Sequence, residues 1–66
     1  MKREYKKINT KINKLITTSF EIGKDIDSCL EGDEENALFL IEVKKIMESA
    51  REKIFEAQYT LGGIYE

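Results

Sequence analysis

The sequence contains no proline, histidine or tryptophan and only one cysteine, Cys29. Within these 66 residues the absences exclude an intramolecular disulfide, a histidine-based acid–base pair and a zinc site built from cysteine and histidine. The longest unbroken apolar run covers residues 37–41, far below the roughly 20 residues that span a bilayer. No apolar segment with a small-residue cleavage site follows the basic N-terminal residues, so we expect no secretory signal and no membrane partner.

The composition is 41% apolar and 36% charged, which is too apolar for simple disorder and too charged for a membrane protein. We expect one helical domain that spans residues 1–66. Chains of this length bury only about 60% of the surface that they would expose when unfolded. A lone monomer would therefore be marginally stable.

The first half of the chain carries a heptad repeat, in which apolar residues recur at spacings of three and four. We name this set the first apolar stripe: Tyr5, Ile8, Ile12, Leu15, Ser19, Ile22, Ile26 and Cys29. The repeat predicts an amphipathic helix over residues 3–30, with Cys29 as a small buried apolar residue. Residues 17–19 and Gly23 have low helix propensity and form the weak point of this helix, and the sequence leaves open whether the helix is kinked or broken there.

The second half repeats the pattern. The second apolar stripe consists of Leu40, Val43, Met47, Ala50, Ile54, Ala57 and Leu61. It predicts a helix over residues 34–61, with Gly32 or Asp33 as its N-cap and Gly62 as a left-handed C-terminal cap. A short polar connection between two long helices predicts an antiparallel hairpin, and thus an all-α fold.

Each predicted helix carries more apolar surface than one helix–helix contact can cover. Around residues 38–47 the apolar side chains extend over more than half of the helix circumference. We therefore expect two hairpins to form a homodimeric four-helix bundle, and the alternative is a three-helix fold with a corner near Ser19. The residues expected in the dimer or core contacts are Ile8, Ile12, Leu15, Ile22, Ile26, Phe39, Leu40, Val43, Ile46, Met47 and Ile54.

Charge is distributed unevenly along the chain. Residues 1–20 contain six basic residues against one acid, whereas residues 21–36 contain seven acids against one lysine. The acidic loop end could bind a basic groove on a larger protein through Asp27, Glu31, Asp33, Glu34, Glu35, Leu38 and Ile41. The basic end could instead contact nucleic acid through Lys2, Arg3, Lys6, Lys7 and Lys11.

The acidic residues do not form a recognisable metal or catalytic motif. Residues 27–38 resemble the start of an EF-hand loop, but Cys29 replaces an oxygen ligand and Leu38 replaces the bidentate glutamate. Glu48, Glu52 and Glu56 share a helix face without the histidines that usually accompany di-metal sites. We therefore expect no enzymatic activity, no metal and no cofactor.

These observations favour a small non-catalytic protein-interaction module. The composition, rich in isoleucine, lysine and glutamate, is typical of A+T-rich bacteria and their phages. We expect a regulator or inhibitor of antirepressor or anti-defence type, acting on a larger protein in the cytoplasm of a bacterial or infected host cell. The alternative is a dimeric regulator that associates with nucleic acid through its basic N-terminal helix.

Overall fold

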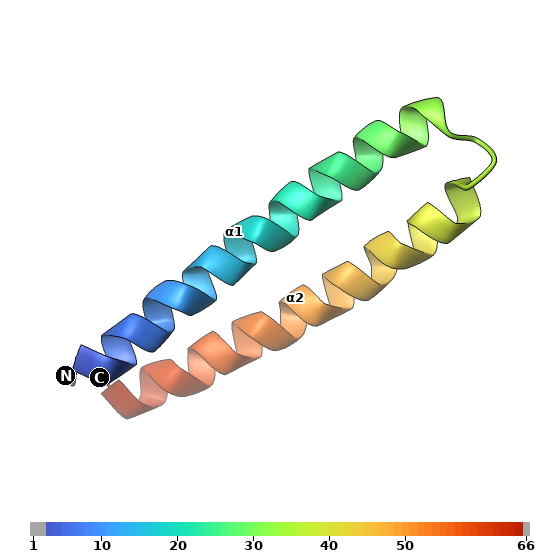
Figure 1. The fold of residues 1–66 in the computed structure, drawn as a ribbon. Coiled ribbons are helices and arrows are strands. Elements are labelled where there is room, and N and C mark those ends of the chain that lie inside the picture. The colour runs from blue at the N-terminus through green and yellow to red at the C-terminus, as the bar shows by residue number, and fades with distance from the viewer. Residues whose placement is uncertain (1–2, 66) are drawn as a thin grey trace.

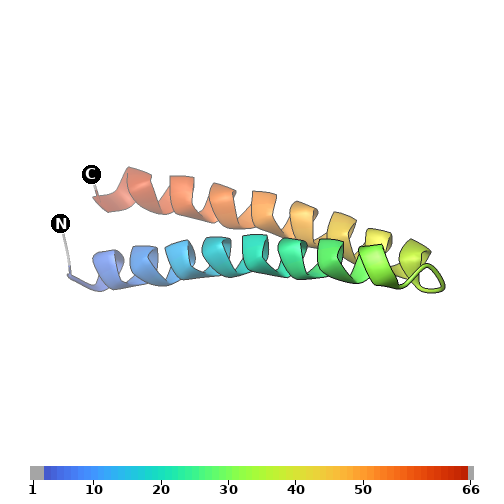
Figure 2. The same ribbon diagram turned by 90° about the horizontal axis from the view of Figure 1, so that it is seen from above.

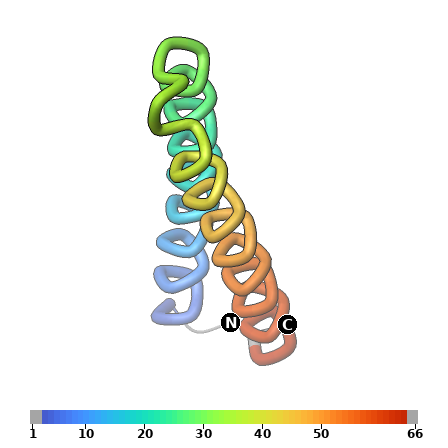
Figure 3. The backbone as a smooth tube through the Cα atoms, turned by 90° about the vertical axis from the view of Figure 1, so that its right-hand side faces the viewer, coloured from blue at the N-terminus to red at the C-terminus, as the bar shows by residue number. Residues whose placement is uncertain are grey.

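A computed structural model describes residues 3–65, which form two long helices. Helix α1 spans Arg3–Gly32 and helix α2 spans Ala37–Tyr65, and the two lie side by side in opposite directions (Figure 1). The hairpin is a thin rod whose Cα atoms extend over 50 × 15 × 11 Å (Figure 2). The helix axes are inclined to each other (Figure 3). The predicted all-α, two-helix hairpin is confirmed.

The helix boundaries differ from the predicted ones. α1 continues two residues beyond residue 30, and α2 begins at Ala37 and continues to Tyr65. α1 runs without interruption through residues 17–23, so these residues of low helix propensity do not break it and the described residues contain no third helix. The predicted cap at Gly62 is also wrong, because no described glycine has a positive φ and α2 continues past this position.

Residues 33–36 connect the helices through a turn that Asp33 stabilises. The Asp33 carboxylate accepts hydrogen bonds from the backbone N–H of Asn36 at 3.2 Å and from its side-chain amide at 2.9 Å. The first backbone bond of α2 follows at once, since the Leu40 N–H donates to the Asn36 carbonyl at 3.0 Å. Asp33 therefore stabilises the turn that leads into α2, but neither Gly32 nor Asp33 is its N-cap, because α2 begins at Ala37 and the Asn36 carbonyl accepts its first backbone hydrogen bond.

The residues that pack between the helices follow a heptad repeat, but not the predicted one. We name this observed set the contact face: Tyr5, Asn9, Ile12, Ile16, Ser19, Gly23, Ile26 and Leu30 on α1, with Ala37, Leu40, Lys44, Met47, Arg51, Ile54, Gln58 and Leu61 on α2. On each helix, one residue in every seven belongs to both the contact face and the apolar stripe, such as Ile12 on α1. At the other stripe positions, the contact face contains the residue that follows the stripe residue in the sequence, such as Asn9 after Ile8. Relative to the stripes, the contact face is therefore rotated by about 50° around each helix.

Very little of the chain is buried. Among the described residues only Ile26 and Ser19 are buried, at 7% and 3% exposure. The chain exposes 5476 Å², whereas a compact monomer of 7.7 kDa exposes about 4,300 Å². The hairpin thus leaves a surplus of roughly 1,200 Å² in contact with solvent. In the described part of the chain, neither helix has a stretch long and apolar enough to cross a membrane.

Candidate functional site

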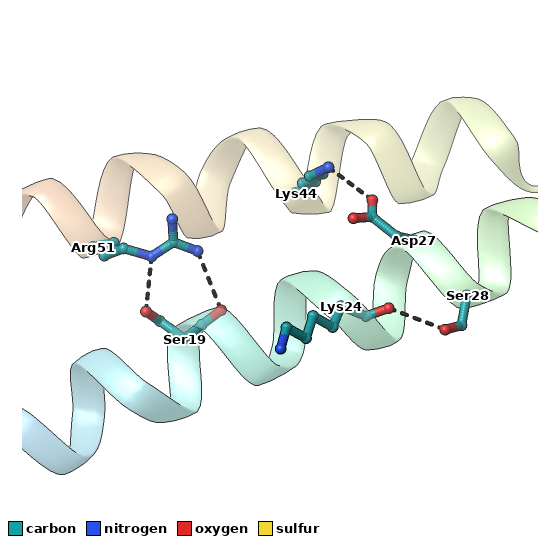
Figure 4. Close-up of polar contacts among 6 residues, drawn as sticks. All are labelled: Ser19, Lys24, Asp27, Ser28, Lys44 and Arg51. Carbon is teal, nitrogen blue, oxygen red and sulfur yellow. Dashed lines mark hydrogen bonds and ion pairs between the residues drawn. The ribbon is translucent and has the colours of Figure 1, made fainter.

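Arg51 joins the two helices near the middle of the hairpin (Figure 4). Its Nε donates to the Ser19 hydroxyl at 2.8 Å and its Nη2 donates to the Ser19 carbonyl at 3.2 Å. The guanidinium also lies over the Phe20 ring, 4.0 Å from the centroid, in a cation–π contact. The buried Ser19 hydroxyl in turn donates to the Ile16 carbonyl at 2.6 Å, so both of its hydrogen-bonding functions are used.

Two further polar contacts cross between the helices. Lys44 Nζ lies 2.7 Å from the Asp27 carboxylate (Figure 4). The hydrogen bond to Asp27 and the attraction of its charge hold the pKa of Lys44 above its ordinary 10.5. Nearer the chain ends, the Gln58 amide donates to the side-chain oxygens of Asn9 and Asn13. The sequence reasoning missed these contacts, although a polar residue recurs at every seventh position of α2 from Lys44 to Gln58.

These contacts show which sides of the two helices coincide. On α1, Asn13, Phe20 and Asp27 occupy one heptad position, and all three reach α2. They mark one side of the hairpin. Each contact face has a second flank, opposite to the one that these three residues occupy. Because the two helices are antiparallel, the second flanks of α1 and α2 both lie on the other side of the hairpin. We name this second surface the apolar face: Ile8, Leu15, Ile22 and Cys29 on α1, with Val43, Ala50, Ala57 and Ile64 on α2.

The apolar face is largely open to solvent. Ile22 is half-buried and the other seven residues are exposed, with Leu15 at 55%. Phe39 and Ile46 extend its edge on α2 and are 74% and 60% exposed. The expected burial of Cys29 is not found in the single hairpin, where this residue is exposed.

The residues predicted for the core and dimer contacts divide between two surfaces. Ile12, Ile26, Leu40, Met47 and Ile54 pack between α1 and α2, and Ile22 is half-buried beside them. The remaining residues are exposed on the apolar face or at its edge: Ile8, Leu15, Phe39, Val43 and Ile46. The apolar stripes therefore include residues of both surfaces.

The predicted partner-binding residues gather at the loop end, but two of the carboxylates already have partners within the chain. Asp27 is paired with Lys44 and Asp33 caps the turn. The carboxylates of Glu31, Glu34 and Glu35 are exposed. Leu38 is 83% exposed and Ile41 is 40% exposed, and both lie on the side of α2 that faces away from the apolar face.

The predicted nucleic-acid residues lie along α1 at the opposite end. Exposed basic side chains surround a shallow hollow, which Arg3, Lys6, Lys7, Thr10, Lys11 and Lys14 line. Lys2 lies outside the described residues. The hollow offers closely spaced cations and no enclosed pocket, so it could contact an extended phosphate backbone rather than hold a small ligand.

The acidic residues of α2 lie on the surface. Glu48, Glu52 and Glu56 are exposed, and Glu56 pairs with Lys53 at 3.2 Å. Lys44, which lies one turn before Glu48 on α2, pairs with Asp27 of α1. No three acidic or cysteine side chains in residues 3–65 come together as a metal site would require.

The candidate functional surfaces of the hairpin are thus one apolar face and two oppositely charged ends. Any functional assignment has to account for their exposure. No protein-family model, curated protein or solved structure matches the chain.

Proposed function

We propose that this chain is a non-catalytic interaction module that forms a homodimeric four-helix bundle and binds a larger protein through its loop end. It would act there as a small regulator or inhibitor of bacterial or phage origin. The observation that carries the proposal is the exposed apolar face, which runs along the whole hairpin. A standard protein–protein interface buries about 800 Å² per partner, which the surplus exposed surface would supply.

The rotation between the apolar stripes and the contact face supports a bundle. In a four-helix bundle each helix packs against two neighbours, so the direction of the bundle core lies about 45° from the direction of either neighbour. The stripes are rotated by about 50° from the observed contact face. They therefore point to where the core of a bundle would lie, between the partner helix in the same chain and a helix of a second chain.

The loop end would remain accessible in this bundle. Leu38 and Ile41 face away from the apolar face, and Glu34 and Glu35 lie in the connection beside them. Exposed apolar side chains rimmed by carboxylates match a partner surface that combines an apolar groove with basic residues. The bundle would carry two copies of this surface.

The dimer is tested by light scattering coupled to size-exclusion chromatography. We expect the wild type to have twice the 7.7 kDa chain mass at micromolar concentration. Leu15→Glu and Ile46→Glu should each produce monomers, because they place charges on the apolar face or at its edge. Tyr59→Glu is the matched control: it changes an 87%-exposed residue on the opposite side and should leave the dimer intact. A wild-type monomer that unfolds cooperatively would refute the proposal.

The partner surface is tested with the purified partner once affinity capture has provided it. Glu34→Lys combined with Glu35→Lys should weaken binding about tenfold or more and remove most of its salt dependence. The matched control makes the same change of charge at Glu48 and Glu52, away from the loop. Equal affinity of both variants would remove the loop end as the binding surface.

The basic hollow on α1 favours a second candidate function, association with nucleic acid. In that case a gel shift should occur at about 50 mM salt, weaken as salt rises and disappear in a Lys6→Glu, Lys7→Glu variant. The absence of a shift at low salt would exclude this function.

A further inference from the structure

The geometry points to a specific dimer: we propose that two copies pair through their apolar faces in antiparallel orientation, so that the basic end of each hairpin lies against the acidic loop end of the other. The inference rests on the homodimer proposed above and adds its orientation and its contacts. A second copy is the occupant because the charges and the spacing of this chain complement themselves.

The two halves of the hairpin carry opposite net charge. The half with the chain ends, residues 3–20 and 51–65, has seven cations against three acids, a net charge of +4. The loop half, residues 21–50, has nine acids against three cations, a net charge of −6. A parallel dimer would place like charges together at both ends, whereas an antiparallel dimer places opposite charges together at both ends.

The same orientation brings together complementary layers of the apolar face. With full overlap of the rods, the two-fold axis crosses α1 near residue 18, and α1 lies against α1 of the partner. Ile8 then meets the partner's Cys29, and Leu15 meets the partner's Ile22. The bulky Ile8 at the open end thus faces the small Cys29 at the loop end, whereas Leu15 and Ile22 pair as two bulky residues nearer the axis.

One ion pair is specific to this orientation. Lys11 and Asp25 lie fourteen residues apart on the flank of the apolar face, both exposed. Fourteen residues of helix separate them by about 21 Å, too far for contact within one chain. In the antiparallel dimer Lys11 lies beside the partner's Asp25, and Asp25 lies beside the partner's Lys11. In a parallel dimer α1 faces α2 of the partner and neither pair forms.

The corresponding flank of α2 places Lys53 near the two-fold axis and thus near the partner's Lys53. This contact does not oppose the arrangement strongly. The Lys53 ammonium lies 3.2 Å from the Glu56 carboxylate of its own chain and is 79% exposed, so its charge is both paired and screened.

Cys29, the only cysteine, reports the orientation directly. In the antiparallel dimer the two Cys29 residues lie about 30 Å apart, and in a parallel dimer they lie in one layer of the core. A short bismaleimide should therefore not cross-link the wild-type dimer. It should cross-link Ile8→Cys, where the new thiol lies beside the partner's Cys29 and about 30 Å from the Cys29 of its own chain.

Exchanging the charges of Lys11 and Asp25 tests the antiparallel orientation independently. The quantity measured is the dissociation constant of the dimer. Lys11→Asp and Asp25→Lys should each raise this constant about tenfold, because each creates two repulsive pairs by symmetry. The double variant should return to within about threefold of the wild type, since it rebuilds both pairs in reverse. Lys14→Asp is the matched control, because it changes the same charge on the outer side of α1.

The outcomes distinguish this inference from the function that it builds on. A monomeric wild type overturns the dimer itself. A wild-type dimer that cross-links through Cys29 overturns only the antiparallel orientation. A dimer that fails to cross-link in Ile8→Cys and does not recover in the double charge variant also overturns the orientation. Cross-linking of Ile8→Cys alone, with recovery in the double variant, supports it.

Discussion

Replacement of Gly23 by alanine should stabilise the protein. Gly23 lies in the interior of α1, where glycine costs about 0.8–1.0 kcal/mol relative to alanine because it loses more backbone freedom on folding. A glycine at a helix–helix contact is often required because a side chain would not fit. Here a Cβ atom would lie 3.8 Å from Arg51 Nη2, an ordinary van der Waals distance.

The expected gain is therefore nearly the whole propensity difference, about 1 kcal/mol per chain. For a domain of this size such a change raises the unfolding temperature by about 4–8 °C. The Arg51 hydrogen bonds to Ser19 should persist, because the new methyl group contacts only the end of a long side chain.

The assay is thermal unfolding followed by circular dichroism at a fixed protein concentration. Gly63→Ala is the control. A Cβ at Gly63 would meet nothing within 4 Å, but this residue lies in the last turns of α2, where helices fray, so we expect less than about half the shift. A lower unfolding temperature for Gly23→Ala would refute the reasoning, because it would mean that residue 23 requires a bend or a closer approach of α2.

Three further variants test the polar contacts. Ser19→Ala should destabilise the protein by about 1–2 kcal/mol in urea unfolding, because it removes a buried acceptor for the Arg51 guanidinium. Gln58→Leu should change stability by less than about 0.5 kcal/mol, since the amides that it leaves behind can bind water. Lys44→Gln should lower stability at pH 8. Because the pKa of Lys44 is raised above 10.5 in the folded protein, its pair with Asp27 contributes fully to the free energy of unfolding at pH 8. This contribution is lost as pH rises through the higher folded-state pKa. The stabilities of wild type and variant should therefore converge in strongly alkaline buffer.

The sequence was sufficient to predict two antiparallel helices, because heptad spacing and a polar break at residues 31–36 are local signals. It predicted half of the contact face correctly, the residues that recur every seven positions, such as Ile12 and Ile26. The other half was displaced by one residue. Hydrophobicity favoured Val43 over Lys44 and Ala50 over the neighbouring arginine, whereas in the hairpin the polar residues lie between the helices.

The helix ends were less predictable for a physical reason. Glycine ends a helix when it adopts a left-handed conformation, but it also tolerates helical angles. With no proline after Gly62 and Gly63, nothing in the local sequence stops α2. The helix therefore continues to Tyr65.

The direction of charge along α1 provides the strongest physical reason to expect an antiparallel second copy. A helix is stabilised by acids near its N-terminus and by cations near its C-terminus. α1 has only Glu4 in its first turn among several cations, and it has no basic residue in its last turn. Each unfavourable charge costs a few tenths of a kcal/mol at an exposed site. Among residues 3–65 of one hairpin, only the Asp27–Lys44 pair offsets this cost in the acidic part of α1. In the antiparallel dimer the basic turns of each α1 lie beside the acidic turns of the other, so the same charges that weaken an isolated helix would stabilise the pair.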